Sequence, residues 1–242
     1  MREWFDEIKA QFILNFINDS RWQFLLNGLI VTLRITFFAL LLGIVIGVVI
    51  AIVRSTYDKN AGLMRKSAGR FFLNFFNVIC KFYLTVIRGT PVVVQLMIFY
   101  FVVLVSIRNG ELIGIIAFGI NAGAYIAEIF RSGIMSIDNG QFEAGRSLGF
   151  NYIQTMRHII IPQAFKNILP TLANEFIVLL KETAVVGYVA VQDLTKAGDI
   201  IRGRTFSAFM PLIAVALVYL ALVIFFTKLV SILERRLRNS ER

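Results

Sequence analysis

The stretch EAGRSLGFNYIQTMRHIIIP, residues 143–162, is charged and contains two glycines, although long apolar sequence lies on both sides of it. Gly149 permits a backbone turn that a side chain would resist. We therefore expect a short helix over 143–148 and a second helical run over 151–161. The ring of Pro162 then favours a break or a helix start. What such a polar helix–turn–helix does depends on where the rest of the chain lies.

The composition indicates a membrane protein. Apolar residues make up 57% of the 242 residues, and the mean hydropathy is +0.74. Charged residues make up 17%, below the roughly 25% of a typical soluble domain. They are gathered in blocks between long apolar runs, as in a chain whose solvent is a bilayer.

The net charge of +10 could also suit a nucleic-acid-binding protein. The basic residues, however, lie between apolar spans rather than along one helix face. Basic loops on the cytoplasmic side of a membrane explain them more simply, so we expect no nucleic acid partner. The single cysteine, Cys80, lies in an apolar run and is interpreted as a small buried hydrophobe.

Five apolar segments are predicted to cross the bilayer, since about 20 apolar residues suffice. They cover about 27–53, 78–106, 112–134, a weaker stretch over 169–187, and 210–233. Gly43 and Gly47 in the first segment form a GxxxG pair, which favours close helix packing. The fold class is therefore an all-α membrane protein with five transmembrane helices.

The distribution of Lys and Arg sets the orientation. With the N-terminus outside, fifteen of them fall on the inside, in segments 54–81, 131–166 and 228–242, and seven fall outside. The positive-inside rule therefore predicts an external N-terminus and a cytoplasmic C-terminus. The stretch 143–162 is then cytoplasmic.

This orientation divides the chain into three parts. Residues 1–24 are predicted to form an amphipathic interfacial segment, with aromatic side chains such as Trp4 and Trp22 at the headgroup level. Residues 25–235 form the transmembrane domain, with a cytoplasmic loop over 137–162. Residues 236–242 form a cytoplasmic tail.

The loop closely resembles a known signature. Glu143-Ala144-Gly145, three residues, Gly149, nine residues, Ile159, one residue and Ile161-Pro162 match the EAA loop of the permease subunits of binding-protein-dependent ABC importers. Gly145 replaces the third Ala, and Ile161 replaces Leu. The spacing is otherwise complete, which makes the resemblance specific.

The resemblance covers roughly residues 25–235 and extends to the polar amino acid branch of that family, of the histidine, glutamine or arginine type. Three further stretches match motifs of that branch: Arg88-Gly89-Thr90-Pro91 with Gln95-Leu96, Ala124 to Ile134, and Lys181 to Val186. Ser132 stands where Gly is more usual.

The resemblance implies the type I importer fold and a permease subunit that carries polar or basic amino acids by alternating access. Its implied partners are a cytoplasmic ATP-binding subunit, a second permease copy in a homodimer or heterodimer, and an extracytoplasmic amino-acid-binding protein. It also implies a location in the bacterial cytoplasmic membrane. The implied coupling helix contacts the ATP-binding subunit through Glu143, Ala144, Gly145, Arg146, Ser147, Leu148, Gly149 and Phe150.

No GxxxxGK[ST] phosphate loop occurs in the chain, so it is not expected to hydrolyse ATP. With one His and one Cys, no nucleophile–base pair stands out either. We therefore expect a transport subunit that is not an enzyme and binds no metal or cofactor. ATP and Mg²⁺ would be bound by the partner subunit.

Acidic and amide side chains inside the predicted spans are candidate substrate ligands, because such groups are costly in a bilayer and usually face a cavity or a partner. Glu128 either meets substrate or braces the helix through Arg131 at i+3. Asn121 lies on the same helix face, with Ala124 between the two. Nearby small residues leave room for close packing or for a cavity.

Pro91 should kink the second span, and a broken helix tends to line a cavity at membrane depth. Thr90 and Gln95 are therefore candidate substrate contacts. Glu175 and Glu182 are candidates in the fourth span, where two acids could attract a cationic amino acid. Arg34 in the first span has no obvious partner.

Two other classes of protein fit the composition. An ATP-independent channel or secondary transporter would need no ATP-binding partner, and the complete cytoplasmic motif argues against it. A structural membrane anchor would need no polar groups at depth. The sequence leaves open which amino acid is carried and whether the membrane domain has its own substrate site.

Overall fold

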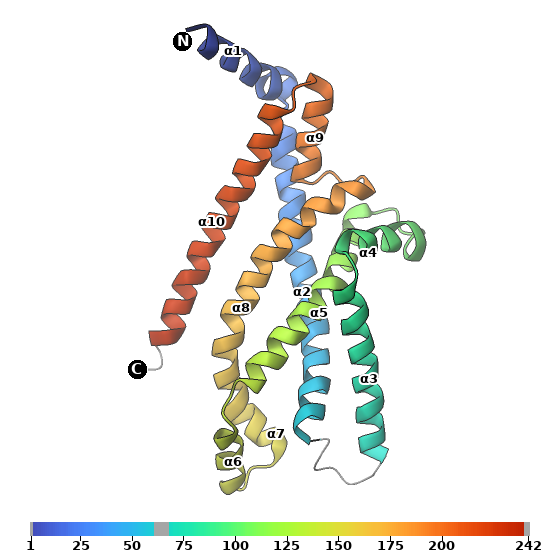
Figure 1. Cartoon of the computed structure of the whole chain (residues 1–242), viewed down its shortest axis with the longest axis vertical. Helices are drawn as coiled ribbons and strands as arrows, with labels where there is room; N and C mark the ends of the chain where they lie inside the picture. Colours follow the sequence, from blue (N-terminus) through green and yellow to red (C-terminus); the bar gives the residue numbers. More distant parts are fainter. Residues whose placement is uncertain (1, 61–67, 240–242) are drawn as a thin grey trace. The chain divides into compact units, whose positions relative to one another are not determined.

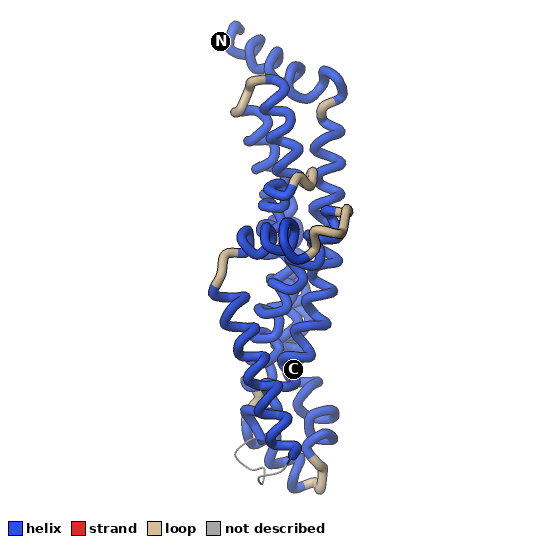
Figure 2. The backbone as a smooth tube through the Cα atoms, turned by 90° about the vertical axis from the view of Figure 1, so that its right-hand side faces the viewer, coloured by secondary structure: helices blue, strands red, loops and turns tan. Residues whose placement is uncertain are grey.

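The computed structural model describes residues 2–60 and 68–239. Helix accounts for most of them, and no strand occurs in these two ranges (Figures 1 and 2). The α-helices are α1 (Arg2–Phe12), α2 (Trp22–Asn60), α3 (Ala68–Gly89), α4 (Val92–Ile98), α5 (Gly110–Met135), α6 (Asn139–Ser147), α7 (Tyr152–Thr155), α8 (Ile161–Glu182), α9 (Leu194–Thr205) and α10 (Phe209–Asn239). Short π-helical turns cover Ile13–Ile17, Phe99–Val103 and Met156–Ile160, and 3-10 turns cover Asn18–Ser20 and Thr183–Val189. Residues 61–67 of the predicted inner loop and 240–242 of the predicted tail lie outside the described residues.

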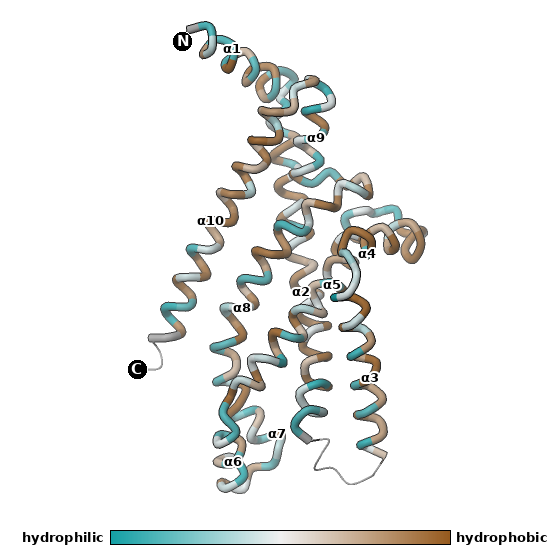
Figure 3. Tube along the Cα trace, viewed as in Figure 1, coloured by the Kyte–Doolittle hydropathy of each residue, from teal (hydrophilic) through white to brown (hydrophobic). Residues whose placement is uncertain are grey.

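Four of the described helices are long and apolar enough to cross a membrane: Trp22–Lys59, Ala68–Gly89, Gly110–Met135 and Phe209–Leu237. Figure 3 shows the apolar character of α10 along most of its length. The fourth predicted span is helical as α8, but it does not join this set, because its charged and amide side chains lower its hydropathy. The five-span count and the external N-terminus therefore remain predictions.

The second predicted span is divided, as the proline required. Helix α3 ends at Gly89 and α4 begins at Val92. The Thr90 hydroxyl donates to the carbonyl of Val86 at 2.8 Å, and so occupies a carbonyl at the end of α3. The Thr90 side chain therefore bonds back to the last turn of α3 at the point where that helix ends.

The chain forms two compact units. The first unit contains Met1–Ala39, Val92–Phe118 and Ile177–Lys228, and the second contains Leu40–Pro91, Gly119–Phe176 and Leu229–Arg242. Several helices contribute residues to both units. Each unit is described separately below.

In the first unit, hydrogen bonds join segments that are far apart in the sequence. The fully buried Asp193 caps α9 by accepting from the backbone N–H groups of Thr195 and Lys196. The Thr32 hydroxyl accepts from the N–H of Leu194 at 3.1 Å. These bonds hold the start of α9 against α2.

Arg34 corrects one expectation. Its guanidinium pairs with Glu111 at 3.0 Å within the first unit, 77 residues away in sequence. The sequence could not indicate Glu111 as the partner, because Glu111 lies on another helix, α5, and helix spacing relates only residues of the same helix. Half of the Arg34 side chain stays exposed, so this pair is a partly screened contact.

In the second unit, the small residues of α2 and α5 serve close packing. A Cβ atom added to Gly47 would lie 2.6 Å from the Ile126 side chain and 2.9 Å from the backbone of Ala127. A Cβ added to Gly119 would likewise lie 2.6 Å from Leu42. The GxxxG pair therefore does what the sequence predicted: it lets two helix backbones approach.

The amphipathic N-terminal segment is helical as α1, followed by the two short turns, and α2 begins at Trp22. Trp4 and Phe5 are 60% and 62% exposed, so α1 presents aromatic surface that the first unit leaves uncovered. Its placement at a membrane interface stays a prediction. Cys80, expected to be buried, is only half-buried, because one side of α3 is open.

Candidate functional site

The segment 137–162, hereafter the coupling segment, folds as two short helices and a π-turn. Helix α6 begins four residues before the predicted start at 143, because Asp138 caps it by accepting from the N–H of Gly140 at 2.6 Å. The predicted second run is found as α7 and the turn Met156–Ile160. The whole segment belongs to the second unit.

Gly149 makes the turn that the sequence predicted. Its φ of 80° lies in the left-handed region, which a side chain would strain. The N–H of Phe150 donates to the Gly145 carbonyl at 3.0 Å, and the N–H of Gly149 donates to the Arg146 carbonyl at 2.9 Å. These two bonds form a Schellman motif, which ends α6 at a fixed point.

The start of α7 is fixed as firmly. The Asn151 side chain accepts from the N–H of Gln154, and the Gln154 side chain accepts from the N–H of Asn151, both at 2.9 Å. This capping box satisfies two backbone donors at the helix start. The angle between the two short helices is therefore set by local sequence on both sides of Gly149.

Pro162 does not break the chain into two helices. A π-turn precedes it, in which the N–H of Ile161 donates to the Met156 carbonyl, five residues back. Although Pro162 has no N–H to donate, α7, the π-turn and α8 follow one another as helix, with Pro162 in the first turn of α8. Of the two alternatives for Pro162, the structure shows the helix start.

The departure from the EAA signature at Gly145 has a packing cause. A Cβ added to Gly145 would lie 2.6 Å from Cγ2 and 2.7 Å from Oγ1 of Thr155 on α7. Gly145 is buried, as is Thr155. The larger residue on α7 therefore requires the smaller one on α6.

The predicted contact residues lie on an exposed surface, with Gly145 the exception. Phe142 and Gly145 are buried, and Phe142 belongs to an apolar cluster with Ile134, Ile160 and Ala164. The exposed members of the predicted set are Glu143, Ala144, Arg146, Ser147, Leu148 and Gly149, while Phe150 is half-buried. Leu148 is 69% exposed, and Ile153 is 74% exposed. Ile153 was not among the predicted contact residues. The coupling segment thus combines a buried anchor with an exposed apolar tip.

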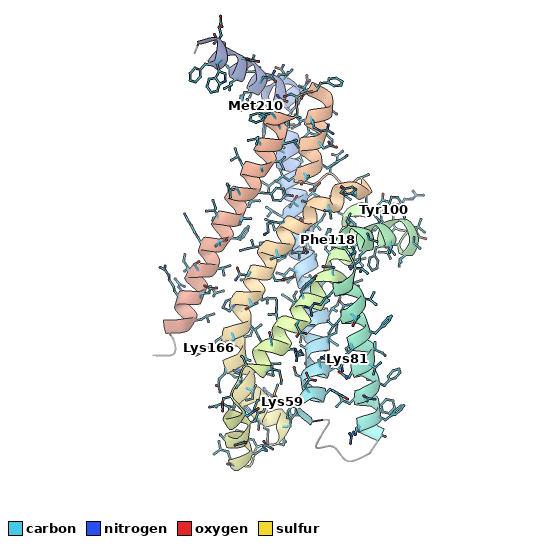
Figure 4. All side chains as sticks on the ribbon, in the orientation of Figure 1. Lys59, Lys81, Tyr100, Phe118, Lys166 and Met210 are labelled. Atoms are coloured by element: carbon cyan, nitrogen blue, oxygen red, sulfur yellow. The ribbon has the colours of Figure 1, made fainter. Side chains whose placement is uncertain are left out.

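A cavity of about 430 Å³ lies beside α6 in the second unit. Lys59 lies at the end of α2 (Figure 4). Its ammonium donates to Asn139 Oδ1 at 2.8 Å and lies 4.3 Å from the centre of the Phe142 ring. The lining residues are Lys59, Asn139, Phe142, Glu143, Arg146, Tyr152 and Thr155. Sequence reasoning missed Lys59, because it is 80 residues from Asn139 and no linear spacing connects them.

The six candidate substrate residues are divided between the units. Thr90, Asn121, Glu128 and Glu175 belong to the second unit, and Gln95 and Glu182 to the first. They are therefore considered unit by unit.

Glu128 makes the contact that the brace alternative expected. Arg131 donates to its Oε1 through Nη2 at 2.5 Å and through Nε at 3.1 Å. Arg131 also pairs with Asp58 of α2 at 3.2 Å, so the brace joins two helices. Asn121 is buried, and Ala124 packs in an apolar cluster. Whether Glu128 also meets substrate stays a prediction.

A second hollow of the same unit, of about 400 Å³ and wide open to the surface, lies next to the break after α3. It is lined by Leu84, Thr85, Arg88, Gly89 and Tyr125. The Arg88 guanidinium lies 5.6 Å from the centre of the Tyr125 ring. The sequence analysis selected Thr90 at this break. Its hydroxyl donates to the Val86 carbonyl of α3, and its contact with substrate stays a prediction.

Of the two candidates in the first unit, Gln95 is buried in α4. Glu182 is half-buried, whereas the adjacent Lys181 is exposed. The inward member of this pair is therefore the acid. Glu175, in the second unit, is also half-buried.

Comparison with known proteins identifies the family of the chain. Residues 43–239 match the family model described as binding-protein-dependent transport system inner membrane component. The chain belongs to this family. The resemblance to this family predicted from the EAA loop is thereby confirmed, and the relatives described next support its polar amino acid branch.

Relatives match over nearly their whole length. A glutamine transport system permease protein of Rickettsia typhi is 37% identical over 217 residues, which is 88% of this chain and 93% of the relative. An arginine transport system permease protein of Bacillus subtilis is 35% identical over 221 residues, which is 90% of this chain and 94% of the relative.

Two solved structures share the fold. One, described as an amino acid ABC transporter with histidines, has a TM-score of 0.79 and 39% identity, and the match covers 91% of this chain and 98% of that chain. The other is an inward-facing methionine ABC transporter with a TM-score of 0.74 and 21% identity, covering 89% of this chain and 97% of that chain. The second likeness concerns the fold alone.

Proposed function

We propose that this family member is the permease subunit of an ATP-driven importer of polar or basic amino acids in a bacterial cytoplasmic membrane. The names of its relatives support this substrate class, since they are glutamine and arginine permeases. The solved neighbour at 39% identity is likewise described as an amino acid transporter.

The observation that carries the proposal is the construction of the coupling segment. Helix α6 is short, fixed at both ends by Asp138 and Gly149, and anchored through buried Phe142. Its opposite surface is exposed. A helix whose one face is anchored in the protein and whose other face is exposed can transmit a movement of a partner protein to the membrane helices.

That partner would be a cytoplasmic ATP-binding subunit, which supplies the phosphate cradle and Mg²⁺ that this sequence lacks. The exposed residues of 143–150 would form the contact. ATP-driven closure of two such subunits would move the coupling segments, and alternating access would follow. A second permease copy, identical or similar, and an extracytoplasmic binding protein would complete the importer.

The cavity beside Arg88 offers chemistry for one end of an amino acid. A guanidinium binds a carboxylate in a bidentate manner, and this one lies at a helix break of an apolar helix. Glu128 lies on α5, three residues after Tyr125, and is a candidate for the cationic group. Asn121, Thr90, Gln95, Glu175 and Glu182 stay candidate contacts on the strength of sequence.

Reconstitution tests the function. The permease is assembled with its ATP-binding subunit and binding protein in proteoliposomes, and uptake of a labelled amino acid panel is measured with and without ATP. We expect uptake of polar or basic amino acids that requires ATP and disappears when the phosphate-loop lysine of the ATP-binding subunit is replaced. Uptake independent of ATP would instead identify a channel or secondary transporter, and no uptake of any amino acid would contradict the substrate class.

A further inference from the structure

The apolar cluster that anchors α6 contains residues of α5 to α8, and in the described part of the chain no residue of α2 belongs to it. Its buried members are Ile134, Ile137, Phe142, Ile160, Ala164 and Ile168, and Ile129, Phe130, Met156 and Ile159 pack against them. This packing joins α6 to the helices that directly precede and follow it. Helix α2 is separated from α6 in the chain by α3, α4 and α5, so a movement of α6 reaches α2 only through non-covalent contacts.

Lys59, in the last turn of α2, makes such a contact. Its ammonium donates to Asn139 Oδ1 at 2.8 Å and lies 4.3 Å from the centre of the Phe142 ring. Asn139 and Phe142 are three residues apart and therefore share one face of α6. Because one ammonium meets both groups, α6 cannot move away from α2 without losing a charged hydrogen bond and a cation–π contact.

The neighbouring residue, Asp58, joins the same turn of α2 to α5. Its Oδ2 pairs with Arg131 at 3.2 Å, and Arg131 Nε donates to Glu128 of α5 at 3.1 Å. Adjacent side chains leave a helix about 100° apart, so Asp58 and Lys59 can reach two different partners. The last turn of α2 is thus tied to α5 by an acid and to α6 by a base.

We propose that Lys59 is a positioning residue that transmits a displacement of α6 to the end of α2. Helix α2 is one of the helices long and apolar enough to cross the membrane, so this contact would make a membrane span follow the coupling segment. Without it, α6 would move with α5 and α8, and α2 would stay behind. The inference rests on the function proposed above, because the displacement originates in the ATP-binding subunit.

Lys59→Met tests the contact. Methionine keeps a long side chain that can still pack on the Phe142 ring, but it has no ammonium. The measured quantity is the amount of amino acid taken up per ATP hydrolysed by the assembled transporter in proteoliposomes. We expect this ratio to fall about tenfold, the shift in an equilibrium that accompanies the loss of one charged hydrogen bond. Lys59→Gln, which also removes the charge, should lower the ratio in the same direction and serves if Lys59→Met does not insert.

The conservative variant separates transmission from a general loss of structure. Lys59→Arg keeps a cation that can donate to Asn139 and lie over the Phe142 ring, so it should retain most of the ratio. Asn139→Ala removes the acceptor of the same hydrogen bond. Combined with Lys59→Met, it should lower the ratio no further than Lys59→Met alone, because both variants break one contact.

Lys81→Met is the matched control. Lys81 is an exposed lysine of α3 whose ammonium lies 6.0 Å from the centre of the Tyr57 ring, so it also makes a cation–π contact with α2. Its contact joins α2 to α3 rather than to α6. We expect Lys81→Met to leave the ratio unchanged.

Hydrogen exchange shows which helix responds, without any measurement of uptake. The transporter in nanodiscs is compared without nucleotide and with ATP held on a hydrolysis-deficient ATP-binding subunit, and backbone exchange is followed in residues 52–60 and 139–148. In the native chain we expect ATP to change the exchange of both segments. In the Lys59→Met variant we expect a change in 139–148 alone.

An equal response of residues 52–60 in the native chain and in Lys59→Met overturns the inference, and so does an unchanged ratio in that variant. Loss of ATP-binding-subunit capture by Lys59→Met in a pull-down also overturns it, because Lys59 would then belong to the docking surface. Failure of the proposed function is distinguishable: the native transporter then shows no ATP-dependent uptake, or its residues 139–148 do not respond to ATP.

Discussion

Gly145 and Thr155 are complementary across the turn of the coupling segment. The space that a Cβ atom on Gly145 would need is taken by the Thr155 methyl and hydroxyl groups, at 2.6 and 2.7 Å. Gly145→Ala should therefore push α6 from α7, at the cost of about 1–3 kcal/mol typical of overpacking. In a pull-down we expect weaker binding of the ATP-binding subunit.

The matched control for that prediction is a double variant. Thr155→Ala removes the obstructing atoms, so Gly145→Ala combined with Thr155→Ala should recover most of the binding. Equal loss in the single and the double variant would show that the two residues act independently.

Gly149→Ala should reduce coupling through the backbone. The left-handed φ costs a residue with a Cβ about 1 kcal/mol or more, roughly a fivefold shift in an equilibrium. We expect a comparable fall in ATP-dependent uptake, with the amount of inserted permease unchanged. Gly203→Ala on α9, where a new Cβ meets nothing within 4 Å, should leave uptake unaffected. Similar losses in both variants would contradict a special role for the turn.

Reversing Glu128 to Lys should abolish uptake of basic amino acids while the complex still assembles, if the carboxylate meets substrate. Asp58→Asn separates this role from the brace, because it removes the second partner of Arg131 and leaves Glu128 in place. We expect Asp58→Asn to retain most uptake, measured in the same proteoliposomes. Unchanged uptake by the Glu128→Lys variant would remove this residue from the site.

Arg88→Gln should raise the KM for uptake at least about tenfold, since a charge-assisted hydrogen bond contributes about 1.5–3 kcal/mol. Arg34→Gln is a suitable comparison, because it also removes an arginine of a predicted span, one that pairs with Glu111 instead of lining a cavity. We expect little change in KM from Arg34→Gln. A KM for the Arg88 variant that equals that of the wild type would place the carboxylate contact elsewhere.

Features governed by local chemistry were predictable from sequence. The turn at Gly149, the break at Pro91 and the packing of Gly47 each follow from a residue whose backbone or size permits one arrangement. The early start of α6 was missed, although Asp138 is a preferred N-cap and could have indicated it.

Features that depend on pairing between distant segments were not predictable. The contact of Lys59 with Asn139 and the pair of Arg34 with Glu111 join residues 80 and 77 positions apart. Neither partner carries a local signal of the other, since helix periodicity relates residues three or four positions apart. The cavity beside α6 could therefore not be predicted from the sequence, although most of its lining residues lie within residues 139–155.

The π-turn at Met156–Ile160 has a mechanical consequence for this region. Because Ile161 bonds to Met156 across the turn, the helical rod from Tyr152 to Phe176 continues without a loop. A displacement of α7 is thus transmitted along consecutive helical segments rather than lost in a flexible loop. The π-turn and Pro170, which lies inside α8, are points at which this helical run can bend, and bending there would change how far a displacement at Thr155 is transmitted.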